Sequence, residues 1–201
     1  CLYVFQQIEK GNGSLDEILT FESRHYYPSS GTIKNSPFGT QFTLREVLYR
    51  TINISDNCGY YMLVDRFGRD GYNRWLDSLG VQYLHLLRPT SNWTSVCTRD
   101  LAIIWNEIYS YYQTGTPTAK TMFNYFLNAQ YNYLKVLLPG YQIAHKSGWT
   151  QTTFNDAGIV LEHSEGPYLI AILTSDREGN ILCPLAKFLD DIMVDYFNWL
   201  D

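Results

Sequence analysis

Two short motifs in this chain combine residue types that can act on a substrate. The first is Ser55-Asp56-Asn57, and the second, about ninety residues later, is Lys146-Ser147-Gly148, preceded by His145. Each tripeptide alone has a structural explanation. Ser, Asp and Asn often bond their own backbone in turns and at helix caps, and Lys-Ser-Gly suits the polar end of a strand. A functional interpretation therefore depends on the elements that carry the two motifs.

The first 139 residues predict mainly helices. Residues 2–10 read as the tail of a helix that stops at Gly11-Asn12-Gly13. Thr43-Leu44-Arg45-Glu46 matches a capping box, which opens a helix running to about Ile52. Further helices are predicted over Asn57–Phe67, over Asp70–Leu79, from Thr98 onwards and over Thr118–Gln130. The Ser55 motif therefore falls on a loop between two predicted helices.

After Pro139-Gly140 the hydrophobic pattern becomes typical of strands. These are predicted over Tyr141–Ser147, Asn155–Glu162 and Tyr168–Thr174, with a hairpin turn at Glu165-Gly166-Pro167. Pro184 then starts a last helix, whose apolar face is expected at Phe188, Ile192, Tyr196 and Leu200. We expect an α+β fold in one domain over residues 1–201. Residues 1–139 would be mainly helical, and 140–201 would form a small antiparallel sheet of three strands with the C-terminal helix packed on it.

The order and setting of the two motifs resemble those of class A β-lactamases and D,D-peptidases of the penicillin-binding protein type. The signature of that family is S-x-x-K, then S-D-N, then K-T-G or K-S-G. Thr43–Leu48 resembles the family's helix before S-D-N, Asn155-Asp156 its next strand, and Leu2–Gly11 the tail of the helix whose start carries S-x-x-K. The resemblance covers essentially the whole chain. It implies a serine hydrolase that acts on β-lactams or D-alanyl peptides through an acyl-enzyme.

The resemblance assigns the reacting groups residue by residue. It implies that the Ser55 hydroxyl relays a proton to the leaving nitrogen when the amide breaks. Lys146 would place a positive charge beside that hydroxyl and the substrate carboxylate, which anchors an anionic substrate. Ser147 would donate a hydrogen bond to the same carboxylate. We therefore expect Ser55 and Lys146 to face each other across a cleft between the helical region and the sheet.

Five neighbouring residues receive supporting roles from the same resemblance. Asn57 would bind the side-chain amide of the substrate and help to fix Lys146. Gly148 would let the substrate approach the strand closely because it has no Cβ, and the backbone N–H of Trp149 would be one oxyanion-hole donor. Asp56 is expected to brace the loop and His145 to pack near the site. The strand that carries Lys146 would border the cleft and could pair with an extended substrate.

The sequence departs from the family pattern at the nucleophile. From the match of Cys1–Gly11, we expect the S-x-x-K serine and lysine a few residues before Cys1, after a first helix and two strands. No serine within the chain has a lysine three positions on. We therefore expect residues 1–201 alone to be inactive by the family's acyl-enzyme route.

A second departure concerns release of the acyl group. Class A enzymes carry a glutamate on a loop between the two motifs, which activates the hydrolytic water. Between Gly80 and Asp100 this chain has neither Asp nor Glu, and Glu107 lies inside the next helix pattern. This favours a D,D-peptidase-like or penicillin-binding role over an efficient lactamase. The alternatives are a non-catalytic module on the same fold that binds peptidoglycan stems or a partner, and an inactive fragment.

Composition limits the other function classes. The net charge of −5 is spread along the 201 residues without a basic patch for nucleic acid. No apolar run is long enough to span a bilayer. The cysteines show no zinc spacing and the histidines no clustering, so we expect no metal and no cofactor, although disulfides remain open. The family resemblance implies an extracellular or cell-envelope location, with the signal region outside the chain. The sequence does not specify an oligomeric state. The cysteines without zinc spacing are Cys1, Cys58, Cys97 and Cys183, and the histidines without clustering are His25, His85 and His163.

Overall fold

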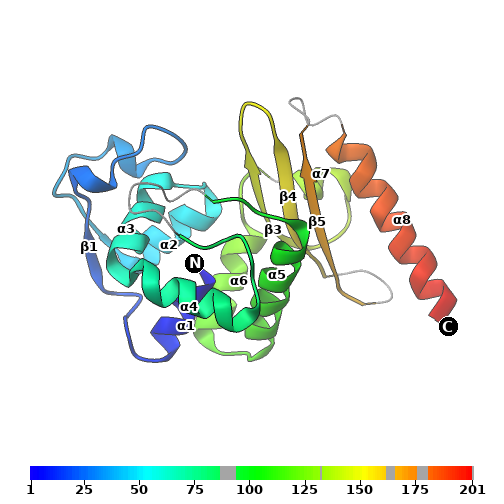
Figure 1. Ribbon diagram of the computed structural model, residues 1–201, viewed down its shortest axis with the longest axis horizontal. Coiled ribbons are helices and arrows are strands. Elements are labelled where there is room, and N and C mark those ends of the chain that lie inside the picture. Colours follow the sequence, from blue (N-terminus) through cyan, green and yellow to red (C-terminus); the bar gives the residue numbers. More distant parts are fainter. Residues whose placement is uncertain (87–93, 132, 162–165, 176–180, 201) are drawn as a thin grey trace. The chain divides into compact units, whose positions relative to one another are not determined.

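The computed structural model describes residues 1–86, 94–131, 133–161, 166–175 and 181–200 (Figure 1). The chain forms two compact units, one of residues 1–95 with 115–125 and one of residues 96–114 with 126–201. The first contains α1 Leu2–Glu9, β1 Ile18–Thr20, β2 Gln41–Thr43, α2 Leu44–Asn53, α3 Asn57–Phe67 and α4 Arg69–Leu79. The second contains α5 Thr98–Gln113, α7 Tyr133–Leu137, β3 Ile143–Trp149, β4 Phe154–Val160, β5 Tyr168–Thr174 and α8 Leu182–Leu200. The helix α6, Pro117–Leu127, contributes residues to both units.

The helices of the first unit begin and end where local chemistry predicts. The Thr43 side chain accepts a hydrogen bond from the Glu46 N–H at 3.2 Å and so caps α2. Gly80 ends α4 in the left-handed conformation, with φ of 70°. The apolar face of α2 is fully enclosed, and its spacing of three and four residues is that of an amphipathic helix. Its buried members are Leu44, Val47, Leu48 and Ile52.

The first unit also contains a small sheet that the sequence did not predict. The strands β1 and β2 pair antiparallel, with Leu19 opposite Phe42. Each strand has three residues, which is too short to show an alternating pattern along the sequence. Their pairing joins segments more than twenty residues apart, so only the tertiary fold reveals it.

The second unit is organised around an antiparallel sheet in the order β3-β4-β5. Ile143 lies opposite Val160, and Val160 opposite Tyr168, so that alternate residues of the three strands share one face. The helices α7 and α8 pack on this face, and α5 also packs against β4 and β5. The core of this unit consists of Leu134, Leu138, Ile143, Val160, Tyr168, Ile170, Ile172, Leu182 and Ala186. The predicted α+β fold with a three-stranded sheet is confirmed.

Details of the second unit differ from the sequence-based expectations. The first strand begins at Ile143 rather than at Tyr141, and the short helix α7 was not predicted. The third strand has the predicted bounds, Tyr168–Thr174. The predicted hairpin turn at Glu165 to Pro167 lies partly outside the described residues.

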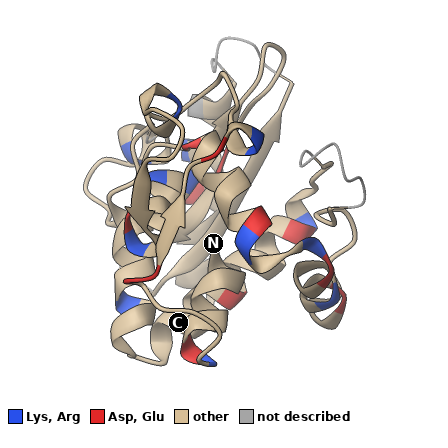
Figure 2. Cartoon of the chain, turned by 90° about the vertical axis from the view of Figure 1, so that its left-hand side faces the viewer, with Lys and Arg blue, Asp and Glu red and all other residues tan. Residues whose placement is uncertain are grey.

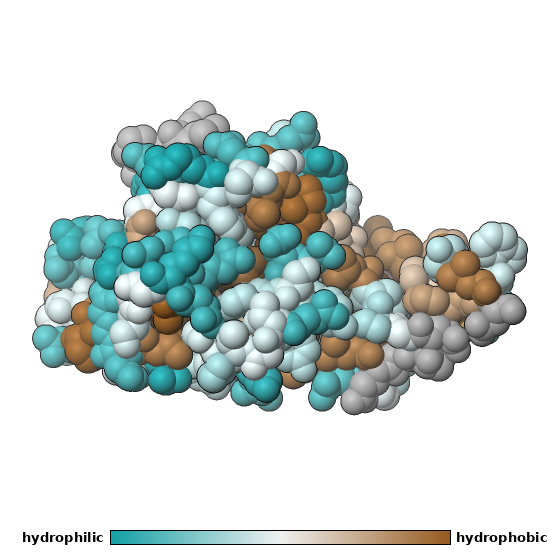
Figure 3. Space-filling model, turned by 90° about the horizontal axis from the view of Figure 1, so that it is seen from below, coloured by the Kyte–Doolittle hydropathy of each residue, from teal (hydrophilic) through white to brown (hydrophobic). Residues whose placement is uncertain are grey.

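The C-terminal helix packs on the sheet through a different face from the one predicted. Leu182 and Ala186 are buried, and Leu185, Leu189, Met193 and Phe197 pack against them. The apolar residues that the sequence analysis assigned to the buried face are exposed, and this part of α8 forms the right-hand end of Figure 3. The helix has apolar residues on two faces, so periodicity alone could not tell which one meets the sheet. The exposed residues are Phe188, Ile192, Tyr196, Trp199 and Leu200.

Close packing between β3 and β4 generates a stability prediction. A Cβ at Gly158 would lie 2.3 Å from the Ala144 carbonyl oxygen, whereas a Cβ at Gly148 would meet nothing within 4 Å. We expect Gly158→Ala to lower the free energy of unfolding by about 1–3 kcal/mol, as overpacking typically does. Gly148→Ala is the matched control in the neighbouring strand and should leave stability nearly unchanged. Thermal and urea unfolding would measure both, and equal stabilities of the two variants would contradict the prediction.

Candidate active site

The Ser55-Asp56-Asn57 motif joins α2 to α3, and the buried Asp56 holds it in place. One carboxylate oxygen of Asp56 accepts the Gly59 N–H at 3.1 Å and so caps α3. The other accepts the N–H groups of Thr32 at 2.6 Å and Ile33 at 2.9 Å. Because a buried carboxylate needs such donors, this set fixes the motif against the loop that precedes α2.

Ser55 has an unusual backbone conformation. Its φ is 55°, in the left-handed region that residues other than glycine seldom adopt. The N–H groups of Ile54 and Asp56, on either side of it, both donate to the Arg50 carbonyl at 3.1 Å. These bonds hold the turn, and strain of this kind is often found at functional positions. Asn57, the first residue of α3, donates its N–H to the Ser30 carbonyl at 3.2 Å.

The Lys146-Ser147-Gly148 motif lies on β3, which is an edge strand of the sheet in the described part of the chain. The Lys146 Nζ donates to the Ser147 carbonyl oxygen at 2.8 Å. Burial lowers the Lys146 pKa to about 8, and the Asp156 carboxylate opposes that shift. At neutral pH this lysine is therefore still mainly charged, but only partly solvated.

The side chains of His145 and Ser147 lie on the face of the sheet that carries α7 and α8. His145 is completely buried, and its Nδ1 lies 3.1 Å from the Asp156 carboxylate, which assigns the ring proton to Nδ1. Asp156 also accepts the Leu134 N–H at 3.2 Å. The Ser147 Oγ and the His145 Nε2 are buried and have no hydrogen-bond partner among the described residues.

The backbone of β3 presents hydrogen-bonding groups at its outer edge. Thr150 donates its N–H to the Thr153 carbonyl in the turn to β4. Backbone groups alternate in direction along an antiparallel strand, so the N–H and C=O of Trp149 point away from β4. The Ser147 carbonyl points the same way, and Lys146 donates to it from that side. An edge of this kind is what the predicted pairing with an extended substrate requires.

Residues that are distant in sequence complete this end of the sheet. Tyr131 lies 4.8 Å from Trp149, measured between ring centroids, and Tyr133 lies 4.6 Å from Phe154. In the sequence, Asp156 is marked only as part of a family-like strand, and the two tyrosines carry no functional signal. The one further signal at Asp156 is a charged residue among apolar strand residues, since a buried charge needs a partner.

The structure places the eight predicted site residues in two groups. Ser55, Asp56 and Asn57 are consecutive residues of the first unit, and His145 through Trp149 are consecutive residues of the second. Within each group the hydrogen bonds above define the geometry. The meeting of Ser55 and Lys146 across a cleft stays a prediction.

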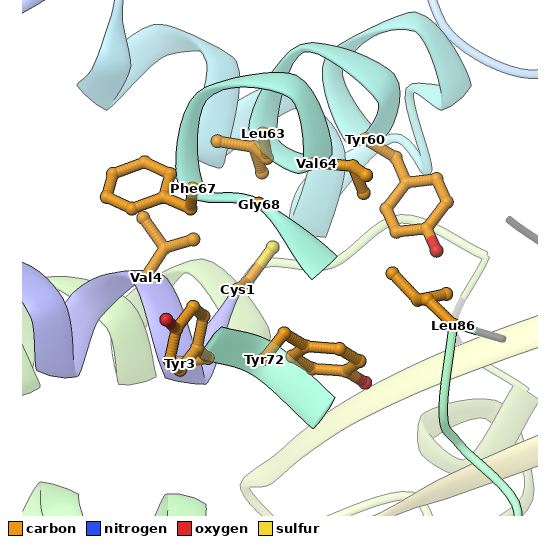
Figure 4. A pocket seen from close by; sticks show the side chains of 10 residues that line it. All are labelled: Cys1, Tyr3, Val4, Tyr60, Leu63, Val64, Phe67, Gly68, Tyr72 and Leu86. Atoms are coloured by element: carbon orange, nitrogen blue, oxygen red, sulfur yellow. The ribbon is translucent and has the colours of Figure 1, made fainter. Parts of the chain in front are cut away.

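A separate cavity of about 80 Å³ lies in the first unit and contains none of these residues. Apolar and aromatic side chains line it, and Figure 4 shows the Tyr60 and Tyr72 rings at one side. Burial raises the pKa of both phenols, that of Tyr72 to about 12, so both are neutral at physiological pH. Neither phenol therefore supplies a phenolate base at that pH. Its lining consists of Cys1, Tyr3, Val4, Tyr60, Leu63, Val64, Phe67, Gly68, Tyr72 and Leu86.

In the cartoon of Figure 2, the positions of basic residues are interspersed with those of acidic residues along the described chain. Among the described residues, no three His, Cys, Asp or Glu side chains come together as metal ligands would. Cys1, Cys58 and Cys97 are free thiols. None of the described helices combines the length and apolarity needed to cross a membrane.

The sequence profile of the beta-lactamase enzyme family matches residues 1–186. The chain therefore belongs to the beta-lactamase enzyme family. This membership supports its assignment to the serine hydrolases. No curated protein sequence matches the chain.

Solved structures agree with this assignment. A point mutant of PBP-A, in an acyl-enzyme complex with penicillin G, is 25% identical, with a TM-score of 0.81 over 92% of this chain and 74% of that protein. A β-lactamase from Sphaerobacter thermophilus is 22% identical over the same shares, with a TM-score of 0.79. The TLA-3 extended-spectrum β-lactamase is 20% identical over 96% of this chain and 81% of its own, with a TM-score of 0.78. The last two likenesses show the shared fold.

The lowered Lys146 pKa predicts a dependence of stability on pH. Between about pH 8 and 10.5, the unfolded chain holds more of this proton than the folded chain does, so stability rises with pH across that window. Lys146→Met has no amine at this position and therefore lacks this contribution to stability. The free energy of unfolding of wild type minus that of the variant should increase from pH 8 to 10.5 and stay level between pH 6 and 7.5. Urea unfolding at several pH values measures this difference, and a level difference throughout would show that the pKa of Lys146 is not lowered in the folded protein.

The donors around Asp56 predict a large effect of its removal. Asp56→Ala would leave three N–H groups without their acceptor, and each buried unsatisfied group costs about 1–3 kcal/mol. We expect a loss of about 3 kcal/mol or more, and a smaller loss for Asp56→Asn, which keeps one acceptor oxygen. The control is Asp16→Ala, whose exposed ion pair with Arg45 should contribute less than about 1 kcal/mol. Similar losses for Asp56→Ala and Asp16→Ala would refute the bracing role.

Proposed function

We propose that this protein is a serine hydrolase that acts on β-lactams or D-alanyl peptides through a serine acyl-enzyme. The observation that carries the proposal is the presence of two polar groups on consecutive residues of β3. The Ser147 Oγ is buried without a partner among the described residues, and the Lys146 ammonium lies on the adjacent residue. An unsatisfied hydroxyl beside a cation is suited to bind a carboxylate, which both substrate classes carry.

In this proposal each motif supplies a separate part of the chemistry. The nucleophilic serine belongs to an S-x-x-K motif expected in the segment before Cys1. Ser55 relays a proton to the leaving nitrogen, and Asn57 binds the side-chain amide of the substrate. Lys146 and Ser147 anchor the carboxylate, while Gly148 permits close approach to the strand.

The Trp149 N–H supplies half of the oxyanion hole. It points outward from the strand edge, where a developing negative charge on the carbonyl oxygen can accept it. Because the group is fixed by the sheet, it needs no rearrangement when the charge forms. His145 and Asp56 are assigned positioning roles through the buried contacts described above.

The proposed reaction stops readily at the acyl-enzyme. Between Gly80 and Asp100 the chain has no Asp or Glu to activate a hydrolytic water. His85 is the one histidine of that segment, and its Nε2 lies 2.8 Å from the Asp77 carboxylate. Loss of a general base typically costs about a hundredfold or more. This supports a penicillin-binding or D,D-peptidase role at the cell envelope rather than efficient β-lactam hydrolysis.

Mass spectrometry of the protein, including the segment before Cys1, tests this function. After mixing with benzylpenicillin, we expect a covalent adduct that persists for minutes or longer. Ser147→Ala should keep its thermal stability, because the Oγ makes no hydrogen bond among the described residues, yet acylate at least about tenfold more slowly. Residues 1–201 alone, without the expected nucleophile, should form no adduct.

Three outcomes would overturn parts of the proposal. Full turnover without a detectable adduct would refute slow release. No reaction of the longer protein would favour the non-catalytic binding module. Normal acylation of Ser147→Ala would remove the carboxylate role assigned to Ser147.

A further inference from the structure

The side chain of Arg50 joins three segments of the first unit. From the last turn of α2, its Nη1 donates to the Thr32 hydroxyl at 3.2 Å, and its Nη2 donates to the Glu46 carboxylate at 2.5 Å. The guanidinium carbon lies 5.0 Å from the centroid of the Phe42 ring on β2, which is close enough for a cation–π contact. The side chain is only 26% exposed, so these contacts hold a half-buried group in one arrangement.

The main chain of the same residue holds the turn at Ser55. The Arg50 carbonyl oxygen accepts the N–H groups of Ile54 and Asp56, each at 3.1 Å, on either side of the left-handed Ser55. The conformation of the turn is therefore fixed at the residue whose side chain also reaches the loop before α2.

Thr32 connects the guanidinium to the carboxylate that braces the turn. The N–H groups of Thr32 and Ile33 donate to the same Asp56 oxygen, at 2.6 and 2.9 Å. Arg50 thus holds the hydroxyl of Thr32, while Asp56 holds its N–H. One arginine acts on both ends of this connection, through its carbonyl at the turn and through its guanidinium at the loop.

These contacts distinguish Arg50 from an ordinary surface ion pair. Glu46 and Arg50 are four residues apart on α2, and an exposed pair of that spacing contributes little to stability. The planar guanidinium, however, binds Glu46 and Thr32 at once and is supported by the ring of Phe42. An arginine with two such partners fixes the distance between α2 and the loop.

We infer that Arg50 is a positioning residue for Ser55 in the proposed reaction. Its carbonyl holds the turn, and its guanidinium holds the loop that supplies two of the three donors to Asp56. The inference rests on the proposed function, in which the Ser55 hydroxyl relays a proton to the leaving nitrogen. Because proton transfer requires hydrogen-bond distance between the two atoms, a small shift of the turn slows the chemical step more than it weakens substrate binding.

The test separates the acylation step from substrate binding. In the protein that includes the segment before Cys1, the rate of acylation is measured against benzylpenicillin concentration, which gives a limiting rate and a dissociation constant. Arg50→Met removes the guanidinium and keeps the carbonyl. We expect the limiting rate to fall about tenfold, since a misplacement of about 1 Å can cost about a hundredfold. The dissociation constant should stay within about twofold, because the proposed carboxylate anchor, Lys146 with Ser147, belongs to the other unit.

Thr32→Val tests the same connection from the loop. It removes the hydroxyl that Arg50 binds and keeps the N–H that Asp56 accepts. We expect a similar fall in the limiting rate. The double variant should lose no more than Arg50→Met alone, because both substitutions remove the same hydrogen bond. This variant also decides the question if Arg50→Met does not fold.

Arg45→Met is the matched control. It removes the same charge from the same helix, at a residue whose ion pair with Asp16 is exposed, and it should keep the wild-type limiting rate. Hydrogen exchange gives a measurement that does not need the reaction. The N–H groups of Thr32 and Ile33 should exchange at least about tenfold faster in Arg50→Met, because the loop opens more often, and at the wild-type rate in Arg45→Met.

The outcomes separate the role of Arg50 from the function on which it rests. A wild-type limiting rate in Arg50→Met or in Thr32→Val would overturn the positioning role and leave the proposed function intact. An equal loss in Arg45→Met, a change in the dissociation constant alone, or unchanged exchange of the two N–H groups would do the same. Absence of acylation in wild type would overturn the proposed function and with it the role of Arg50 in the reaction, whereas the exchange rates would still show whether Arg50 holds the loop.

Discussion

The Asp156 carboxylate lies in the interior of the sheet-bearing unit, where an ionised group is stable only with donors around it. Those donors come from two other elements, the His145 ring on β3 and the Leu134 N–H at the start of α7. One side chain therefore ties β4 to β3 and to α7. Its negative charge also opposes the burial that lowers the pKa of Lys146. The Asp156 carboxylate therefore contacts the strand that carries the lysine motif and influences the charge of its lysine.

Asp56 has the corresponding role in the helical unit. Three backbone N–H groups converge on it, from α3 and from the loop before α2. The same loop approaches so closely at Gly31 that a Cβ there would lie 2.2 Å from the Asp56 Cγ. Each of the two motifs is thus held by a buried aspartate. Fixed hydrogen bonds of this kind define the geometry of each motif within its own unit.

The polar groups that remain unsatisfied are as informative as those that are paired. Burying a hydroxyl without a partner costs stability, and proteins usually avoid it. The Ser147 Oγ on the edge strand is buried without a partner among the described residues, and the adjacent Lys146 is itself partly desolvated. A ligand carboxylate would relieve both, which is why these two residues carry the proposed function. The exposed rings of Tyr131 and Trp149 extend the same edge with an apolar surface.

The sequence predicted the longer helices, the three strands of the larger sheet, the capping of α2 and the placement of the two motifs on a loop and a strand. Those features depend on neighbours a few residues apart, so local patterns specify them. Only long-range packing shows which face of α8 meets the sheet, since that helix has apolar residues on two sides. It also decided the β1-β2 pairing and the partners of Asp156 and Trp149. Each of these joins residues that are far apart in the chain, and no local pattern encodes which distant group will satisfy a buried charge or pair with a strand.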